Sequence, residues 1–245
     1  MDGISVITPC ASAKYLEAIY ENLLNQIDPP AWEWIIFAEN SAYDEAIEMD
    51  RYPEVKVIAS GKHPDHNVGA AIGRNRALMN ARMKYIQPLD ADDLLADDSL
   101  KIMYTALEEN PTAGFAFGRA SDIIDGEIMA PLKMDMAEGL HDDLSHDEID
   151  TILPMNICWR KELLYYLGGW PAFWNREDSA LTHSAGEVSR SYFTGRVTMY
   201  YCKREDSLSE KGRQAENVEE LESEYLVYKE SRVEALGKKD WAWFR

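Results

Sequence analysis

The strongest constraint on the fold is a regular alternation of short apolar runs with longer amphipathic segments over the first half of the chain. The apolar runs are rich in β-branched and aromatic residues and predict strands at 4–9, 32–38, 55–60, 85–90 and 113–123. Apolar residues at helical spacing predict helices at 14–27, 69–83 and 98–110, and we expect a polar turn at 39–44. Strands that alternate with helices indicate βαβ units, and therefore an α/β fold with a mainly parallel central sheet and flanking helices.

Four polar clusters follow the predicted strands. In an open sheet of this kind, ligands bind beyond the carboxyl ends of the strands. Because those ends lie at one edge of the sheet, we expect the clusters to converge on one binding site. The clusters are Pro9-Cys10-Ala11, Glu39-Asn40-Ser41, the loop from His63 to Asn67, and the segment from Asp90 to Asp93.

Beyond Asp125 the alternation loosens into an acidic, loop-rich stretch. We expect a strand and a helix before the Gly168-Gly169 turn, then an aromatic loop, a second helix and a late strand near 197–205. Neither a repeat nor a low-complexity linker interrupts the sequence, so we expect one domain with a C-terminal helical extension. The expected boundaries are 1–215 for the domain, with halves at 1–124 and 125–215, and 216–245 for the extension.

The balance of charges excludes one class of partner. Lys and Arg total 25 against 44 Asp and Glu, which gives a formal net charge of −19. Nucleic-acid backbones are bound by basic surfaces, so we expect no nucleic-acid partner. A phosphorylated small molecule remains compatible with this charge, because one divalent cation and one or two arginines can hold it.

The cysteines and the N-terminus bear on the compartment. The three cysteines lie far apart without CxxC spacing, which favours reduced buried thiols over a zinc site or a disulfide framework. The opening MDGISVITPC lacks the basic and apolar regions of a signal peptide, and no window approaches the roughly 18 apolar residues of a spanning helix. We therefore expect a cytoplasmic protein without a transmembrane segment, and leave a peripheral membrane contact open.

Four blocks of sequence carry a family resemblance. In order they are ISVITPCASAKYLEAIYENLLNQ, WIIFAENSAYD, NVGAAIGRNRALMNARMKYIQPLDADD and LLYYLGGWPAFWNREDSAL. Together they resemble the inverting nucleotide-sugar glycosyltransferases of family 2, which have the GT-A fold, over roughly 4–209. The resemblance implies metal-dependent, inverting transfer of a sugar from a nucleoside-diphosphate sugar to a hydroxyl of a saccharide, protein or lipid-linked acceptor. It makes 1–124 the nucleotide-sugar-binding half and 125–215 the acceptor and catalytic half.

The resemblance assigns Asp90-Ala91-Asp92 to the donor. It implies that Asp90 contacts the ribose and that Asp92 binds Mn²⁺ or Mg²⁺ bridging the diphosphate. Hard divalent ions take oxygen ligands, often one or two carboxylates together with substrate phosphates. The alternative is solvated charge at the end of a strand. We interpret Asp93 and Asp97 as loop charge and Asp98 as the cap of the following helix.

Other donor-side residues are implied by position. Arg74 matches an arginine near the diphosphate, with an ordinary surface ion pair as the alternative. Glu39 stands where the family usually has an aspartate that accepts from the base, and its alternative is an exposed turn residue. Ala11, near Pro9, stands where an aromatic ring commonly stacks on the base. These two departures leave the identity of the base open.

The pair Glu177-Asp178 matches the family's acidic catalytic pair. Inversion requires a carboxylate that takes the proton of the acceptor hydroxyl as its oxygen attacks the anomeric carbon. The resemblance gives this role to Asp178, with Glu177 as the other candidate because helix starts are poorly fixed by sequence. The alternative role is that of an acid stabilised by the N-terminus of a helix.

The remaining assignments concern the acceptor and a closing loop. Trp170 and Trp174 offer aromatic faces for an acceptor sugar, or else pack in the core. His183 touches the acceptor or the metal, or else has a purely structural role. Lys203 and Arg204 stand where the family often has a histidine, and a cation there would neutralise diphosphate in a closing loop. The C-terminal KKDWAWFR is expected to pack on the protein itself or to form a homodimer.

A second class of function stays open. The departures at Ala11 and Glu39 and the missing histidine are compatible with a noncatalytic nucleotide-sugar-binding or scaffold protein that retains the fold. The presence of both the Asp90-Ala91-Asp92 motif and the Glu177-Asp178 pair favours an enzyme. A nucleotidyltransferase would need a Gly-rich, basic N-terminal loop, and TPCASAKYL is neither.

Overall fold

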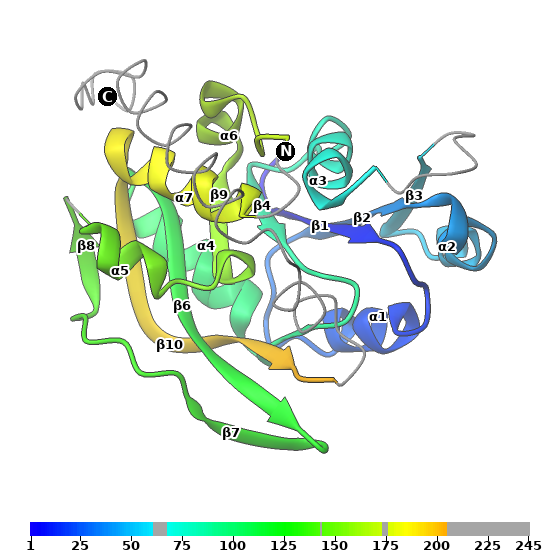
Figure 1. Cartoon of the computed structure of the whole chain (residues 1–245), viewed down its shortest axis with the longest axis horizontal. Coiled ribbons are helices and arrows are strands. Elements are labelled where there is room, and N and C mark those ends of the chain that lie inside the picture. Colours follow the sequence, from blue (N-terminus) through cyan, green and yellow to red (C-terminus); the bar gives the residue numbers. More distant parts are fainter. Residues whose placement is uncertain (61–67, 143, 173–175, 205–245) are drawn as a thin grey trace, which may run out of the picture.

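One sheet of ten strands organises the part of the chain that the computed structural model describes, residues 1–60, 68–142, 144–172 and 176–204 (Figure 1). The order along the sheet is β3-β2-β1-β4-β9-β6-β10-β5, and β7 and β8 pair with β6 and β10. The strands are β1 (Ile4–Cys10), β2 (Trp32–Ala38), β3 (Val55–Ala59), β4 (Tyr85–Pro88), β5 (Leu94–Leu95), β6 (Ala113–Ile124), β7 (Glu127–Pro131), β8 (Gly139–His141), β9 (Ile157–Arg160) and β10 (Arg190–Cys202).

The direction of the strands confirms the expected mainly parallel sheet. Strands β1, β2, β3 and β4 pair in parallel, with Ile4 opposite both Trp32 and Tyr85. The short strand β9 is antiparallel to both β4 and β6, so β6 runs in the same direction as β4. Strand β10 then pairs in parallel with β6. The carboxyl ends of the long parallel strands therefore lie at one edge.

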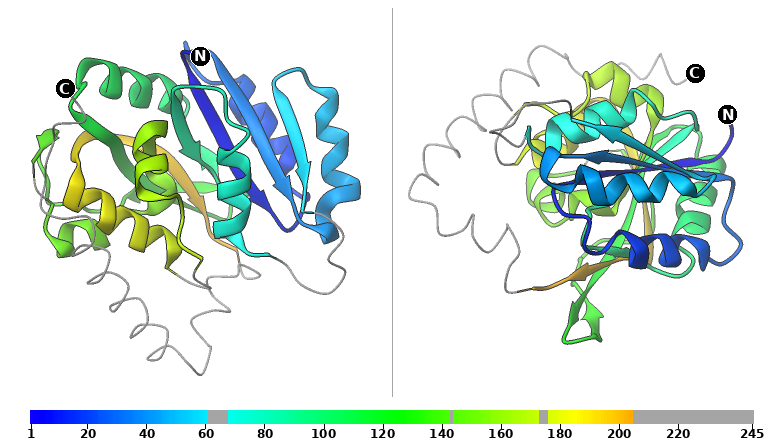
Figure 2. Two further views of the ribbon diagram at one scale, coloured as in Figure 1. Left: turned by 90° about the horizontal axis from the view of Figure 1, so that it is seen from above. Right: turned by 90° about the vertical axis from the view of Figure 1, so that its right-hand side faces the viewer.

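Helices cover both faces of this sheet. Helices α1 and α4 lie on one face, and α3, α6 and α7 lie on the other (Figures 1 and 2). The helices are α1 (Leu16–Leu24), α2 (Asn40–Ala46), α3 (Ala70–Leu78), α4 (Ser99–Glu109), α5 (His146–Asp150), α6 (Lys161–Leu167) and α7 (Glu177–Val188), with 3₁₀ turns at Ile47–Arg51 and Pro154–Asn156.

The alternation of side chains along the strands produces two hydrophobic cores. Val6 and Trp34 point to the side of α1 and α4, whereas Ile7 and Ile35 point to the side of α3, α6 and α7. All four side chains are fully buried, and burial of one such side chain contributes about 1.5–3 kcal/mol to folding. The two cores fix the helices against the sheet.

Helix α2 stands where a polar turn was expected after β2. The predicted polar turn at 39–44 is wrong, because α2 begins directly after Glu39. The amide of Ala42 donates to the carbonyl of Glu39 at 2.9 Å, which closes the first helical turn. The loop from His63 to Asn67 and the extension at 216–245 lie outside the described residues. Among the described helices, none has the length and apolar character needed to cross a membrane.

Candidate active site at the carboxyl edge of the sheet

The ends of β1 and β2 are tied together by backbone and side-chain hydrogen bonds. The amide of Glu39 donates to the carbonyl of Cys10 at 2.8 Å, and Ser41 Oγ donates to the carbonyl of Ala11 at 3.1 Å. The end of β4, which pairs with β1, places Asp90 at the same edge. Three of the four predicted polar clusters are thus brought to one edge of the sheet.

A glycine lets helix α3 approach this edge closely. A Cβ atom on Gly73 would lie 2.9 Å from Pro9 Cβ and 3.1 Å from Phe37 Cδ1, closer than side chains tolerate. The absence of a side chain at Gly73 therefore allows α3 to pack directly over the end of β1. The next residue, Arg74, is carried into the site by this packing.

Arg74 connects two parts of the site that are far apart in sequence. Its side chain is 3% exposed. Nη2 donates to Asp90 Oδ1 at 2.9 Å, and Nη1 donates to Glu177 Oε1 at 2.6 Å. Nη2 also lies 3.3 Å from the sulfur of Met155. The alternative of a surface ion pair is wrong, because this arginine is buried between the strand-end aspartate and the first residue of α7.

The electrostatics of this group depend on burial. Burial alone would lower the pKa of Arg74, but the carboxylates of Asp90, Asp178 and Glu177 outweigh it, and the pKa is raised. Burial raises the pKa of Glu177, as does the neighbouring Asp178, while Arg74 acts in the opposite direction. Burial likewise raises the pKa of Asp178, against the effect of Arg74. One cation therefore serves three carboxyl groups in a poorly solvated space, and proton affinity is high at the start of α7.

The two acids of α7 have different surroundings. Glu177 is engaged by the guanidinium of Arg74. Asp178 is partly exposed, and its Oδ1 accepts from the backbone amide of Ser179 at 2.7 Å. Arg176, directly before the pair, has a φ of +63°, a left-handed conformation that non-glycine residues rarely adopt. Of the two carboxyl groups, that of Asp178 is the one left available to a ligand.

Glu39 is committed to the loop that leads into α3. Its Oε1 accepts from the backbone amides of Val68 at 3.0 Å and Gly69 at 3.3 Å. Burial raises the pKa of Glu39, and these two hydrogen bonds lower it. The alternative of an exposed turn residue is wrong, since only 5% of Glu39 is exposed. Nearby, Ala11 is exposed and Pro9 is partly buried.

Asp92 faces a cation from the end of β10. Its side chain is 43% exposed, and its Oδ2 lies 3.3 Å from Nη1 of Arg204. The guanidinium of Arg204 stacks on the ring of Tyr15, with Cζ 3.8 Å from the ring centroid. Lys203 turns elsewhere and pairs with Asp122 at 2.7 Å. The two predicted cations therefore separate, and only Arg204 reaches the aspartate motif.

The interpretation of Asp93 as loop charge is wrong. Asp93 is 2% exposed, and its Oδ1 accepts from the amide of Cys202 at 2.9 Å, which joins the motif to the end of β10. Burial raises its pKa to about 8, assisted by the charges of Asp90 and Asp92.

Asp98 occupies the cap position of α4 but makes no capping hydrogen bond with its side chain. It pairs instead with Arg196 at 3.2 Å.

The expected acceptor residues divide in a similar way. Trp170 is 3% exposed and packs in the core under α3, α6 and α7, so the interpretation as an open aromatic platform is wrong for this residue. His183 is 2% exposed, and its Nε2 lies 2.9 Å from Asp150 Oδ1 on α5. That contact agrees with a structural role for the histidine. Trp174 lies outside the described residues.

The carboxylates at this edge fit a divalent cation that is shared with a ligand. Among the described residues, no three His, Cys, Asp or Glu side chains are grouped so that they would enclose a metal by themselves. Asp90 and Asp92 are both partly exposed. Mg²⁺ and related ions commonly use one or two carboxylates together with substrate phosphates and water. The donor set of the site is of this kind.

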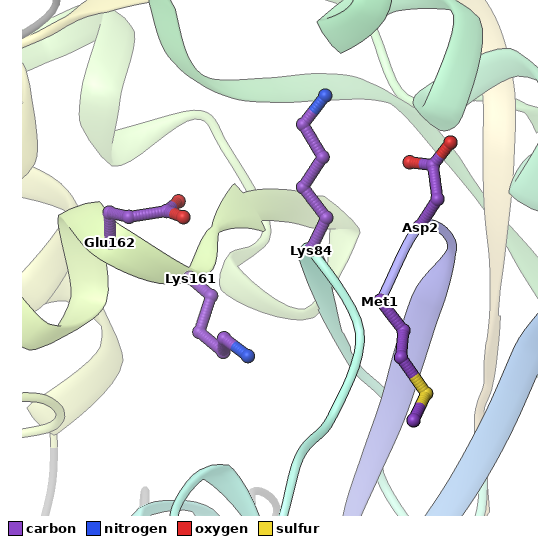
Figure 3. Close-up of a pocket in the computed structure, with 5 residues that line it drawn as sticks. All are labelled: Met1, Asp2, Lys84, Lys161 and Glu162. Carbon is purple, nitrogen blue, oxygen red and sulfur yellow. The ribbon is translucent and has the colours of Figure 1, made fainter.

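A shallow pocket lies at the opposite edge of the sheet. Met1, Asp2, Lys84, Lys161 and Glu162 line it, as Figure 3 shows. These residues precede β1 and β4 or begin α6, so the pocket is at the amino ends of the parallel strands. None of its residues belongs to the predicted site, and it lacks the cluster of acids and arginine found at the carboxyl edge.

Two residues that the structure brings to the site escaped sequence reasoning. Tyr15 lies four positions after the exposed Ala11. It is the first aromatic residue after Ala11 on the same loop, and this position was the signal that could have identified it. Asn75 follows Arg74 and bonds with the backbone of Trp170. A polar amide next to the buried Arg74, on a helix that packs on a sheet, needs hydrogen-bond partners, but no local pattern in GRNRAL marks it.

Comparisons with known proteins agree with this arrangement. The family model described as Glycosyl transferase family 2 matches residues 5–164. The putative teichuronic acid biosynthesis glycosyltransferase TuaG of Bacillus subtilis (strain 168) is 32% identical over 115 residues, which are 46% of this chain and 45% of TuaG. The chain thus spans about half the length of this relative.

Solved structures share the fold. The crystal structure of S. aureus TarS 1-349 in complex with UDP-GlcNAc has a TM-score of 0.75 at 21% identity and covers 93% of this chain and 66% of its own. The same protein in complex with UDP gives 0.68 at 20% identity, with 83% and 61% covered. The expected GT-A fold is confirmed by this likeness. Because the family model spans well over half of the sequence, the chain belongs to glycosyl transferase family 2.

Proposed function

We propose that the protein is a metal-dependent, inverting glycosyltransferase that moves a sugar from a nucleoside-diphosphate sugar to an acceptor hydroxyl. The observation that carries the proposal is the placement of Arg74 between Asp90 and Glu177. This contact joins the aspartates at the end of β4 to the acids at the start of α7. A donor-binding motif and a candidate base thereby share one site.

The donor that we propose is a uridine-diphosphate sugar. TarS, which shares the fold, has been crystallised with UDP and with UDP-GlcNAc. In this chain Asp90 would contact the ribose, and Arg74 would lie near the diphosphate. Pro9, Ala11 and Ala91 would border the nucleotide, and the carboxylate of Glu39 would lie beside the base.

Asp92 would hold Mn²⁺ or Mg²⁺ through its partly exposed carboxylate. The ion, when bound, supplies Lewis-acid stabilisation of the charge on the leaving diphosphate. Arg204 lies next to this carboxylate and would contribute a second positive charge. Lys203 is assigned a weaker part, because its ammonium group is paired with Asp122.

The base that we propose is Asp178. Glu177 is held by Arg74, whereas Asp178 is partly exposed; burial raises the pKa of both acids. A raised pKa suits a carboxylate that must take a proton from a hydroxyl. In the reaction, Asp178 takes that proton and the acceptor oxygen forms a bond to the anomeric carbon. The bond from that carbon to the diphosphate oxygen breaks with its electron pair, and the nucleoside diphosphate leaves.

The acceptor that we propose is a saccharide hydroxyl, free or lipid-linked. The relative TuaG, a putative teichuronic acid biosynthesis glycosyltransferase, supports this choice. The chain's net charge of −19 argues against nucleic acid as acceptor. Transfer to a protein hydroxyl in an acceptor screen would contradict this choice of acceptor.

The first experiment is a thermal-shift screen of UDP, GDP, dTDP, CDP and ADP, each with and without Mn²⁺. We expect stabilisation by UDP that depends on Mn²⁺, because binding to the native state alone raises its stability. Asp92→Ala should remove the dependence on Mn²⁺. Asp97→Ala is the matched control, since it removes an exposed carboxylate from a nearby turn beyond β5.

The outcomes separate the two classes of function. Stabilisation by another nucleotide would change the nucleobase that we propose for the donor and would leave the proposed enzymatic activity in place. Binding of UDP with Mn²⁺ but no release of UDP from any UDP-sugar, with any acceptor tried, would favour a noncatalytic nucleotide-sugar-binding protein. Absence of a shift with all five nucleotides would contradict the proposal.

A further inference from the structure

Asn75 makes two hydrogen bonds with the backbone of one distant residue. Its Nδ2 donates to the carbonyl of Trp170 at 2.8 Å, and its Oδ1 accepts from the amide of Trp170 at 2.9 Å. A primary amide that satisfies both the N–H and the C=O of one residue fixes position and orientation together, because both bonds are directional. Helix α3 therefore holds the turn after α6 through this side chain.

The turn itself is built to receive the amide. Gly168 and Gly169 have φ values of +80° and +76°, which favour glycine. A Cβ atom on Gly169 would lie 2.2 Å from Asn75 Oδ1. The amides of Gly168 and Gly169 donate to the carbonyls of Tyr165 and Leu164, which ends α6. The glycines thus serve both the end of α6 and the close approach of Asn75.

The preceding residue of α3 holds the other end of the same connection. Arg74 pairs with Glu177, the first residue of α7, while Asn75 holds Trp170. Two consecutive side chains of one helix therefore fix the last residue of the turn and the first residue of the acid-bearing helix. Arg74 also donates to Asp90, so the same helix is held in place relative to the Asp90-Ala91-Asp92 motif.

We propose that Asn75 is a positioning residue for sugar transfer. It fixes the backbone of Trp170, which lies in the same buried core as Leu181 and Ala185 of α7, and so keeps Asp178, in the first turn of α7, at a fixed place relative to Asp90. An ion pair to Glu177 alone tolerates variation in distance and angle, whereas the amide pair does not. Misplacement of a reacting group by about 1 Å costs on the order of 100-fold in rate. This inference rests on the proposed function, because it acts through Asp178.

The test compares Asn75→Ala and Asn75→Asp with wild type. The aspartate is nearly isosteric, still accepts from Trp170 N and cannot donate to Trp170 O. Arg76→Ala is the matched control, because Arg76 is an exposed residue of the same helix. Three measurements are made on each full-length protein. They are UDP affinity with Mn²⁺, hydrogen exchange of backbone amides, and release of UDP from the best of UDP-GlcNAc, UDP-glucose and UDP-glucuronic acid.

We expect UDP affinity to stay within about twofold, because the variants leave the donor-side residues in place. Exchange should rise in peptides that cover Gly168 to Trp170 and the start of α7, with β1 and α1 unchanged. The turnover rate for UDP release should fall by about tenfold or more with little change in the KM for donor. In an Asp178→Asn background, Asn75→Ala should cause no further loss, since both act on the same step.

Each contrary result has its own meaning. Unchanged exchange at the start of α7 in both variants overturns the positioning role. A full additional loss in the Asp178→Asn background overturns it too, because Asn75 would then act independently of that acid. Failure of wild type to bind any of the five nucleotides with Mn²⁺ would contradict the proposed function instead, and the exchange measurement would still decide whether Asn75 holds α7.

Discussion

Arg74 Nη1 lies 2.6 Å from Glu177 Oε1, although the two residues are 103 positions apart. The contact is buried, with 3% of the arginine side chain and 11% of the glutamate side chain exposed. It joins a helix that packs over the donor-side strands to the helix that carries the candidate base. The site therefore depends on the packing of both halves of the sheet and does not reside in either half alone.

Replacement of Arg74 tests that dependence. Arg74→Ala would leave its two ion-pair partners, Asp90 and the buried Glu177, without their cation. Loss of one partner from a buried pair costs about 3–5 kcal/mol. We expect a fall of this size in the free energy of unfolding, measured by urea denaturation at neutral pH. Arg76→Ala removes an exposed arginine from the same helix and should change the free energy of unfolding by less than about 0.5 kcal/mol. Equal effects of the two variants would contradict a buried ionic link.

The two acids of α7 can be separated by their amides. Asp178→Asn should keep Mn²⁺-dependent UDP binding and reduce UDP release by at least about 100-fold, because the candidate base is removed. Glu177→Gln keeps a hydrogen-bond acceptor for Arg74 and should retain much more activity. The measurement is the initial rate of UDP formation from a UDP-sugar. Full activity in Asp178→Asn, or a greater loss in Glu177→Gln, would make Glu177 the base.

Much of the site was predictable because its residues occur in short, ordered patterns. Asp90, Asp92 and the pair at 177–178 each lie where a predicted strand ends or a helix begins, and parallel topology brings those places together. The strand–helix alternation predicted the sheet for the same reason. Local pattern carries this information well.

The local sequence pattern did not predict which residues of the site are buried. Asp93 sits among three other acidic or small residues in DADD, and nothing local distinguishes it from its exposed neighbours. Its burial comes from the end of β10, more than a hundred positions later. Trp170 fails as an acceptor platform for a similar reason, because it packs in a core formed with residues of α3, α6 and α7 that are distant in sequence.

Arg204 offers a test of how the site receives a cation. Its guanidinium already lies 3.3 Å from Asp92 and stacks on Tyr15, so a divalent ion must compete with it. We expect Arg204→Ala to bind Mn²⁺ alone a few-fold more tightly, since an exposed ion pair is worth about 0.2–1 kcal/mol. The variant should bind UDP with Mn²⁺ more weakly, because one positive charge near the diphosphate is lost.

The measurement is titration of free Mn²⁺ by electron paramagnetic resonance. Lys203→Ala is the matched control, because this lysine pairs with Asp122 and should leave Mn²⁺ affinity unchanged. Unchanged Mn²⁺ affinity in Arg204→Ala would show that the arginine does not compete for Asp92.

Asp93 predicts a pH dependence of stability with a definite sign. An aspartate in the unfolded chain has a pKa of about 3.9, whereas burial raises the pKa of Asp93 to about 8 in the folded protein. Between these values the folded state binds the extra proton, so the contribution of Asp93 to stability is present below about pH 4 and is lost as the pH rises toward 8.

Asp93→Asn cannot titrate, so the free energy of unfolding of the variant minus that of wild type should increase from pH 5 to pH 8. The measurement is urea denaturation of both proteins in EDTA, with Asp97→Asn as the exposed control from the turn beyond β5. A difference that stays flat or decreases over this range would show that Asp93 is ionised in the folded protein and that its hydrogen bond from Cys202 outweighs its burial.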